Sequence, residues 1–253
     1  MPSQLAQDLA HVDRGMVVAP AGCGKTHLIS EAVGCSHGRQ LVLTHTHAGV
    51  KAIRERMIRL GVPPQLYRVA TIDAFALKYA SAFPALSGWT IREPEGDQWK
   101  SLRPAALLAC RAPAVIDVLR ASYVGVYVDE YQDCTIGQHT LIMELAALLP
   151  CRILGDPLQA IFRKINKADA LAWQLARDNF PEVGVLDQPH RWLGRNDDLG
   201  HWLLDVRNSL LAGQAVDLAD GPGIELRLGE PSEAYQISTC AQGFKLGGTV
   251  VAL

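Results

Sequence analysis

The sequence lacks the features that mark secreted, zinc-thiolate and membrane-spanning proteins. Its six cysteines are scattered and form no C-x-x-C pair, which argues against a disulfide framework or a thiolate zinc site. No apolar run approaches the roughly 20 residues that cross a bilayer, because residues 105–110 (AALLAC) are followed by Arg111. The N-terminal residues lack the basic start and apolar core of a secretory signal. We therefore expect a cytoplasmic protein without a membrane partner.

The sequence also lacks an excess of charge of either sign. Its net charge is −2, so composition alone gives no case for nucleic-acid binding, which would have to depend on a local patch. With 253 residues, of which 49% are hydrophobic and 20% charged, the chain is long enough for one large globular domain or two smaller ones.

Short runs of valine, leucine and isoleucine alternate with helix-like segments. Such nearly continuous apolar runs are typical of a parallel sheet covered on both faces. Residues 48–60 place Val50, Ile53, Met57 and Leu60 at helical spacing. The pattern predicts an α/β fold with right-handed crossovers. The predicted strands are residues 16–19, 41–44, 67–72, 123–128 and 151–155.

Two stretches interrupt this alternation. Residues 84–120, with proline, tryptophan and a Leu/Ala-rich helical part, are interpreted as a small insertion. After about residue 185 a new section begins, with a helix-like stretch at 201–211 and strand-like stretches at 224–228 and 249–253. We therefore expect one domain over residues 1–185 and the start of another over 186–253.

A phosphate-binding loop is predicted at residues 19–26 (APAGCGKT), which nearly fit G-x-x-x-x-G-K-[ST] with Ala19 in place of the first glycine. The loop follows a predicted strand and opens a predicted helix, as its mechanism requires. Its backbone N–H groups can point at phosphate oxygens. Lys25 is expected to reach the β- and γ-phosphates and Thr26 to ligate Mg²⁺. The alternative is a chance glycine turn. The predicted nucleotide contacts are Ala19, Pro20, Ala21, Gly22, Cys23, Gly24, Lys25 and Thr26.

Two carboxylates follow the predicted strand at residues 123–128. Asp129 and Glu130 would lie at the carboxyl edge of the sheet, where open α/β sheets bind ligands. Asp129 is expected to hold Mg²⁺, and Glu130 to orient and deprotonate an attacking water. A solvated acidic turn is the alternative. Together with the loop, the acids predict hydrolysis of a nucleoside triphosphate such as ATP.

The chain resembles superfamily 1 DNA helicases of the UvrD/Rep type over about three quarters of its length. The likeness implies a RecA-like P-loop NTPase domain. It also implies that residues 84–120 correspond to the family's accessory 1B domain, shortened here to a helical stub. Family-like stretches occur in the family's order: Gln4, the phosphate loop (motif I), 41–57 (LVLTHTHAGVKAIRERM, motif Ia), 70–75 (ATIDAF, motif Ib), 128–133 (VDEYQD, motif II), 153–162 (ILGDPLQAIF, motif III) and 186–192 (LDQPHRW, motif IV).

The resemblance implies a role for residues at each of these stretches. Gln4 would read adenine, Gln159 would sense the γ-phosphate, and Arg191 would act as an arginine finger. On the DNA side, Thr44, His45 and Thr71 would face single-stranded DNA, and Phe162 would stack on a base. A basic track, or an ordinary solvated helix face, is formed by Lys51, Arg54, Arg56 and Arg59.

Several positions depart from the family pattern. His27 and His190 stand where an arginine and an aromatic residue normally sandwich adenine, so stacking there would be weaker. Asp73 replaces a histidine in motif Ib, where its charge would repel DNA phosphates. A metal role for His45 and His47 is disfavoured, because no third ligand is near in the sequence.

Nothing after residue 192 resembles the family's late motifs, which belong to a second RecA-like domain. We therefore expect that domain to be incomplete, as in a truncated product, a fragment or half of a split enzyme, with a second chain able to supply it. The favoured function is the ATPase part of a helicase or of a DNA-dependent ATPase. The alternatives are a non-catalytic nucleotide-binding module that regulates a partner, and a small-molecule P-loop kinase, which would leave motifs Ia, III and IV unexplained.

Overall fold

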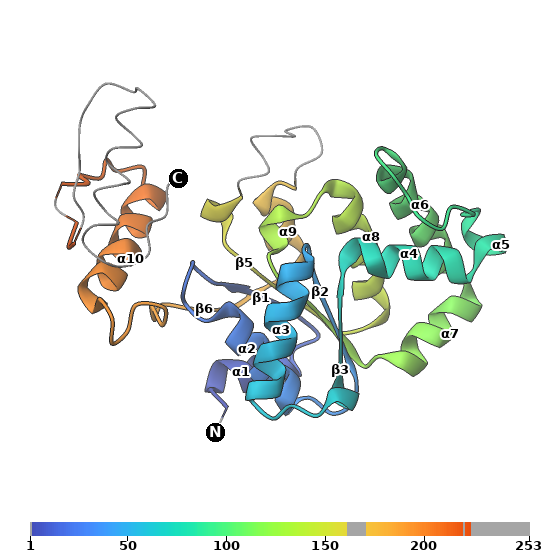
Figure 1. Ribbon diagram of the computed structural model, residues 1–253, viewed down its shortest axis with the longest axis horizontal. Coiled ribbons are helices and arrows are strands. Elements are labelled where there is room, and N and C mark those ends of the chain that lie inside the picture. The colour runs from blue at the N-terminus through green and yellow to red at the C-terminus, as the bar shows by residue number, and fades with distance from the viewer. Residues whose placement is uncertain (1, 161–170, 220, 224–253) are drawn as a thin grey trace, which may run out of the picture. The chain divides into compact units, whose positions relative to one another are not determined.

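The computed structural model describes residues 2–160, 171–219 and 221–223. The chain divides into two compact units, residues 1–200 and 201–253. The first is built on a six-stranded parallel sheet of order β3-β2-β4-β5-β1-β6 (Figure 1). The predicted α/β class with a helix-covered parallel sheet is confirmed. Its strands are β1 (Arg14–Val18), β2 (Gln40–Thr44), β3 (Tyr67–Thr71), β4 (Gly125–Val128), β5 (Cys151–Gly155) and β6 (Glu182–Val185).

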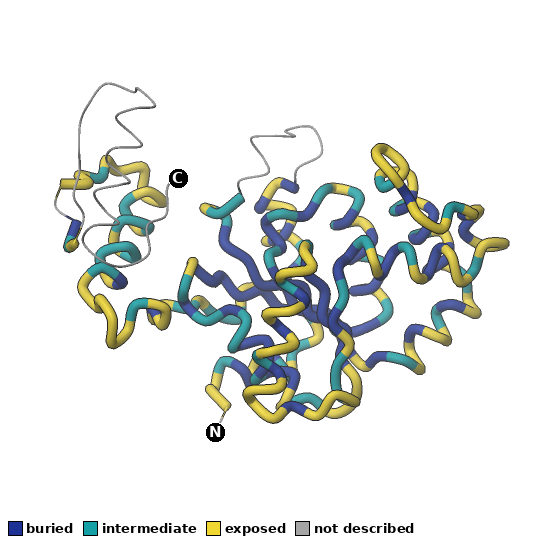
Figure 2. Tube along the Cα trace, viewed as in Figure 1, coloured by how far each residue is buried: buried dark blue, intermediate teal, exposed yellow. Residues whose placement is uncertain are grey.

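Both faces of the sheet are buried because successive side chains of each central strand enter different cores. In β1, Met16 and Val18 join one hydrophobic cluster, whereas Val17 joins the other. In β2, Leu41 and Leu43 face the first cluster and Val42 the second. Figure 2 shows these buried strands between partly exposed helices. This arrangement explains why the strands appear in the sequence as continuous apolar runs.

Three helices cover one face of the sheet: α1 (Gln4–His11), α2 (Lys25–Cys35) and α3 (His47–Arg59). They lie side by side, with α2 in contact with both others. The hydroxyls of Ser3 and Thr46 accept the backbone N–H of Ala6 and Gly49, so each caps the start of its helix. The first turn of α2 has no side-chain cap, which leaves it suited to an anion.

The other face carries the remaining helices of this unit. The predicted insertion at 84–120 falls largely on α5, α6 and α7, and α6 packs against α4 and α8. Leu102 and Cys110 of α6 belong to the same core as Met16 of β1, so α6 is an integral part of the domain. The equivalence to a reduced 1B domain stays a prediction. These helices are α4 (Ile72–Ala82), α5 (Pro84–Ser87), α6 (Gln98–Arg111), α7 (Pro113–Ser122), α8 (Ile136–Leu148) and α9 (Trp173–Asn179).

The later part of the chain is described only as far as residue 223. The predicted helix at 201–211 is found as the larger part of α10 (Asp197–Leu211), while the predicted strands at 224–228 and 249–253 lie outside the described residues. The boundary at residue 185 and the incomplete second domain stay predictions. Within the described ranges, no helix combines the length and apolarity needed to traverse a bilayer.

Candidate nucleotide-binding site

The predicted phosphate loop connects β1 to α2 at the carboxyl edge of the sheet. Ala19 is fully buried, and its N–H donates to the carbonyl of Gly155 at 2.9 Å, which anchors the loop to β5. The N–H of Cys23 donates to the carbonyl of Pro20 at 3.2 Å, which closes a turn. Lys25 then begins α2 with only 9% of its surface exposed. The loop therefore presents a cation and a helix N-terminus at one point.

Two loop glycines have backbone conformations and close neighbours that disfavour a side chain. Gly22 and Gly24 have φ of 77° and 91°, in the left-handed region that favours glycine. A Cβ on Gly22 would lie 2.9 Å from Cβ of Arg191, and one on Gly24 would lie 3.1 Å from the His190 ring. The N–H of Arg191 also donates to the carbonyl of Gly22 at 3.0 Å. The predicted motif IV residues are thus packed directly on the loop.

The predicted acids follow β4 without a gap. The N–H of Asp129 donates to the carbonyl of Leu43 at 2.8 Å, which extends the sheet by one bond, and the residue is 4% exposed. Glu130 has φ of 54°, a conformation uncommon outside glycine, and its N–H donates to Oδ1 of Asp129 at 3.0 Å. This turn directs the two carboxylates differently, one buried and one partly open.

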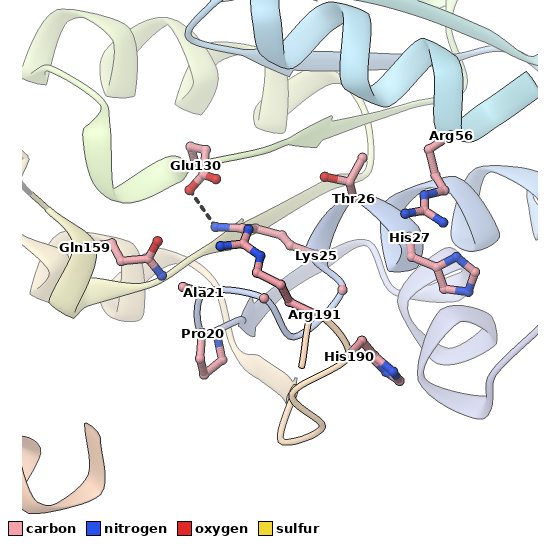
Figure 3. Close-up of a pocket in the computed structure, with 12 residues that line it drawn as sticks. Pro20, Ala21, Lys25, Thr26, His27, Arg56, Glu130, Gln159, His190 and Arg191 are labelled. Carbon is pink, nitrogen blue, oxygen red and sulfur yellow. Dashed lines mark hydrogen bonds and ion pairs between the residues drawn. The ribbon is translucent and has the colours of Figure 1, made fainter. Parts of the chain in front are cut away.

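An ion pair joins the loop to the acids. Nζ of Lys25 lies 2.5 Å from Oε2 of Glu130, with side-chain exposures of 10% and 37% (Figure 3). The same oxygen accepts Nε2 of Gln132 at 2.8 Å. Two segments that are 105 residues apart in the sequence therefore meet in one hydrogen-bonded contact.

Burial and neighbouring charges shift the pKa values of these acids in opposite directions. Burial raises the pKa of Asp129 to about 7, against the opposing charge of Lys25. Burial also acts to raise the pKa of Glu130, but the charge of Lys25 and the hydrogen bond from Gln132 outweigh it, so the net pKa is lowered. Glu130 is thus an anion at neutral pH, whereas Asp129 is only partly ionised there, and a divalent cation beside it would favour the ionised form.

Replacing Asp129 with asparagine is expected to stabilise the magnesium-free protein more at about pH 8 than at about pH 5. The pKa of Asp129 in the folded state, about 7, exceeds the value of roughly 3.9 in an unfolded chain. Wild-type stability therefore falls as pH rises through this window, because the unfolded state releases the proton there while the folded state still binds it. Thermal unfolding of both proteins in EDTA measures the effect, and a pH-independent difference would contradict it.

A cavity of about 420 Å³ lies at the loop and Glu130, with a lining drawn from five separate segments. Most of the predicted nucleotide-contacting residues meet here, although their individual roles stay predictions. Two predicted residues, Ala19 and Cys23, are buried beside it and do not line it, and neither does Asp129. The lining residues are Pro20, Ala21, Gly22, Gly24, Lys25, Thr26, His27, Arg56, Glu130, Gln159, His190 and Arg191.

Gln4, the predicted reader of adenine, is not part of this cavity lining. It lies exposed in the first turn of α1, where its Nε2 donates to Oδ1 of Asp8 at 2.8 Å. His27 and His190, the predicted adenine-flanking pair, do line the cavity. His27 lies 3.4 Å from the carboxylate of Glu31, one turn later in α2.

Arg56 is a cavity residue that the sequence did not single out. The sequence pattern places it in the possible basic track of α3, whereas its side chain reaches towards Thr26 and His27 (Figure 3). Its Nε is buried and has no hydrogen-bond partner among the described residues. The sequence feature that could have identified Arg56 is its position on α3 next to Ile53 and Met57, the buried residues that face the sheet.

Replacing Arg56 with alanine is expected to weaken nucleotide binding about 5-fold, as for a partly exposed charge pair. The reason is that its guanidinium adds a positive charge beside the start of α2. Arg59→Ala is the matched control, because Arg59 lies exposed at the end of the same helix and its Nε donates to the carbonyl of Glu55. Titration with a fluorescent ATP analogue compares them, and equal affinities would contradict the assignment.

The residues predicted to contact DNA occupy the ends of β2 and β3. Thr44 is buried, and the Thr71 hydroxyl accepts the N–H of Ala74 at 3.0 Å, so it caps α4. His45 is half-buried with Nε2 3.6 Å from Sγ of Cys134, and burial lowers its pKa. Phe162 lies outside the described residues. DNA contact by these residues stays a prediction.

The charge of Asp73 is compensated within the fold. Nε and an Nη atom of Arg103 donate to its two carboxylate oxygens at 3.0 and 3.2 Å, and Nε2 of Gln138 donates at 3.3 Å. Such a two-bond arginine pair neutralises the carboxylate. The repulsion of DNA phosphates expected from Asp73 in the sequence is therefore reduced by a partner that lies 30 residues later.

No protein-family model matches the sequence, and the comparison with curated proteins gives no match. Solved structures do match, and two of them align with the chain at 13% identity each. Arterivirus nonstructural protein 10, a helicase in complex with DNA, has a TM-score of 0.43 and covers 88% of this chain and 48% of its own. Pif1 helicase from Bacteroides, in complex with ADP-AlF3 and single-stranded DNA, has a TM-score of 0.46, with coverages of 100% and 58%. The chain therefore spans about half the length of these two proteins.

Proposed function

We propose that the chain is the ATP-binding and ATP-hydrolysing part of a UvrD-like superfamily 1 DNA helicase or of a single-stranded-DNA-dependent ATPase. The Lys25–Glu130 ion pair is the observation that supports this most, because it brings the cation of the phosphate loop and the acid of motif II into contact inside one cavity. A chance glycine turn and an unrelated acidic turn would not be expected to meet.

The residues around the cavity fit a magnesium-bound triphosphate. Lys25 and Arg191 supply two positive charges for phosphate oxygens, and the loop backbone supplies N–H donors. In the described part of the chain, no group of three metal-ligating side chains exists, but Mg²⁺ at nucleotide sites takes only one or two carboxylates plus phosphates. Asp129 and Thr26 would hold it. When bound, the ion neutralises charge on the β- and γ-phosphates.

Glu130 would act as the base that takes a proton from the attacking water. The water oxygen bonds to the γ-phosphorus, the bond to the β–γ bridging oxygen breaks, and ADP leaves. The triphosphate competes for Lys25, so Glu130 loses the cation that lowers its pKa and becomes a stronger base when substrate is bound. Arg191 would stabilise charge on the transferring group, with Gln159 beside it in the cavity.

Single-stranded DNA and a second RecA-like domain complete this proposal. Thr44, His45, Thr71 and Phe162 are the proposed DNA contacts, and the closing domain would come from further residues of this protein or from a second chain. A cytoplasmic location suits the free thiols of the described cysteines.

ATP hydrolysis with and without single-stranded DNA tests the proposal. A motor should hydrolyse ATP faster when DNA is present, because DNA binding and nucleotide closure are coupled. Equal rates with bound DNA, or nucleotide binding without hydrolysis in either condition, would favour the regulatory module instead.

A further inference from the structure

Gln132 is a buried amide that lies between Glu130, the proposed base, and Asp156, which directly follows strand β5. It belongs to the short helix η2 (Tyr131–Asp133) and is 4% exposed. Its Nε2 donates to Oε2 of Glu130 at 2.8 Å, and its Oε1 accepts the N–H of Asp156 at 3.0 Å. Because the backbone N–H requires an acceptor, the amide orientation is fixed and its NH₂ group faces Glu130.

Asp156 continues the contact towards the cavity. Its carboxylate accepts the N–H of Leu158 at 3.1 Å and Nε2 of Gln159 at 2.7 Å, both in η3 (Pro157–Gln159). Gln159 and Glu130 both line the cavity (Figure 3). A continuous series of polar contacts therefore runs from Lys25 through Glu130, Gln132 and Asp156 to Gln159.

Gln132 and the Trp173 ring both pack against Gly155, the last residue of β5. A Cβ added to Gly155 would lie 2.6 Å from Oε1 of Gln132 and 3.0 Å from the ring of Trp173. Trp173 is 9% exposed. Movement of the segment after β5 would therefore alter the surroundings of this indole.

We propose that Gln132 is a positioning residue that couples the occupancy of the phosphate site to the segment carrying Gln159. Oε2 of Glu130 accepts both Lys25 and Gln132. When a triphosphate draws Lys25 away, Gln132 is the donor that remains bound to Oε2 of Glu130. Since the same amide holds the N–H of Asp156, reorientation of Glu130 is transmitted to β5 and η3. This inference rests on the proposed function, because it requires a triphosphate in the cavity.

Two substitutions distinguish the donor function of the Gln132 amide, towards Glu130, from its acceptor function, towards Asp156. Gln132→Met keeps the side-chain length and removes the hydrogen bonds to Glu130 and Asp156, together with a longer one of 3.5 Å from Nε2 to Oδ2 of Asp133. Gln132→Glu keeps an acceptor for Asp156 but places a carboxylate against Glu130. Gln174→Met is the matched control, because Gln174 is exposed on α9 and its Nε2 donates to Oδ1 of Asp178 on the surface of the same helix.

The readouts are the Kd of a non-hydrolysable ATP analogue with Mg²⁺, the rate of ATP hydrolysis, and the nucleotide-induced change in Trp173 fluorescence. The fluorescence is measured in a Trp192→Phe background, because Nε1 of Trp192 would lie 3.5 Å from a Cβ on Gly22 and would respond to nucleotide itself. Loss of the signal in Trp173→Phe identifies its source.

We expect Gln132→Met to keep the analogue Kd within about 3-fold of wild type, to lose the Trp173 response, and to lower the hydrolysis rate at least 10-fold, roughly the value of a hydrogen bond to a charged group. We expect Gln132→Glu to lower hydrolysis further, because the added carboxylate repels Glu130. A purely structural role would lower the unfolding temperature and leave the Trp173 response per bound nucleotide intact.

A Gln132→Met protein that binds the analogue, responds and hydrolyses like Gln174→Met would overturn the coupling role and leave the proposed function standing. Absence of analogue binding by wild type would instead contradict the proposed function itself. If Gln132→Met does not unfold cooperatively, Gln132→Glu decides, since a wild-type fluorescence response and rate in that variant would equally overturn the inference.

Discussion

Lys25→Ala is expected to weaken ATP binding at least about 100-fold, the value of a strong hydrogen bond between charged groups. The substitution has two consequences in this cavity. It removes the cation that begins α2, and it leaves Glu130 without the ion pair that now neutralises it. The triphosphate would then meet an uncompensated carboxylate, so repulsion adds to the lost attraction. Equilibrium titration with a fluorescent ATP analogue and Mg²⁺ measures the change.

Lys51→Ala is the matched control for this experiment. The Lys51 side chain is 79% exposed and lies 3.9 Å from Glu55 on the surface of α3, so its loss should leave ATP affinity unchanged. ATP affinity in Lys25→Ala equal to that of Lys51→Ala would show that the phosphate cradle is elsewhere.

Glu130→Gln is expected to lower ATP hydrolysis by about 10²–10⁴-fold, the usual contribution of a positioned general base. Nucleotide affinity should stay the same or increase, because the neutral amide no longer competes with the triphosphate for Lys25. This opposite effect on binding and turnover separates a catalytic role from a merely structural one. Steady-state hydrolysis and analogue binding on the same preparation give both numbers.

The control here is Glu55→Gln, because the Glu55 side chain is 54% exposed on α3. A Glu130→Gln protein that hydrolyses ATP at the rate of this control would remove Glu130 from the mechanism. The double variant Lys25→Ala/Glu130→Gln adds a second check, since residues in direct contact should give non-additive changes in affinity.

The central strands could be predicted from the sequence because each buries both faces and therefore appears as a continuous apolar run. Edge strand β6 could not, because it contains a glycine and a glutamate and its residues stay partly exposed. Helix α1 was missed for a similar reason, since only Ala6 and Leu9 of its residues are buried. A helix or strand is thus easier to recognise from the sequence when it buries more apolar surface.

The loop and the acids could also be predicted, because each is a contiguous segment whose chemistry depends on local spacing. That the two segments converge on one site is itself a prediction from the sequence, because both follow strands of one sheet. The direct Lys25–Glu130 ion pair could not be predicted, because it depends on strand order: β5 lies between β1 and β4 and brings Gly155 beside Ala19. The same limit applies to Arg56 and Gln132, whose roles follow from neighbours that are distant in the sequence. Gln4 is the opposite case: the sequence predicts a nucleotide contact for it, but Gln4 is not part of the described cavity lining.

A crystal structure with Mg²⁺ and a non-hydrolysable ATP analogue tests most directly whether the loop and the acids form one triphosphate site. We expect Nζ of Lys25 to leave Glu130 and bond phosphate oxygens, with the metal ligated by Thr26 and Asp129. An analogue bound elsewhere on the protein, or a Lys25–Glu130 pair that persists beside a bound triphosphate, would contradict this expectation.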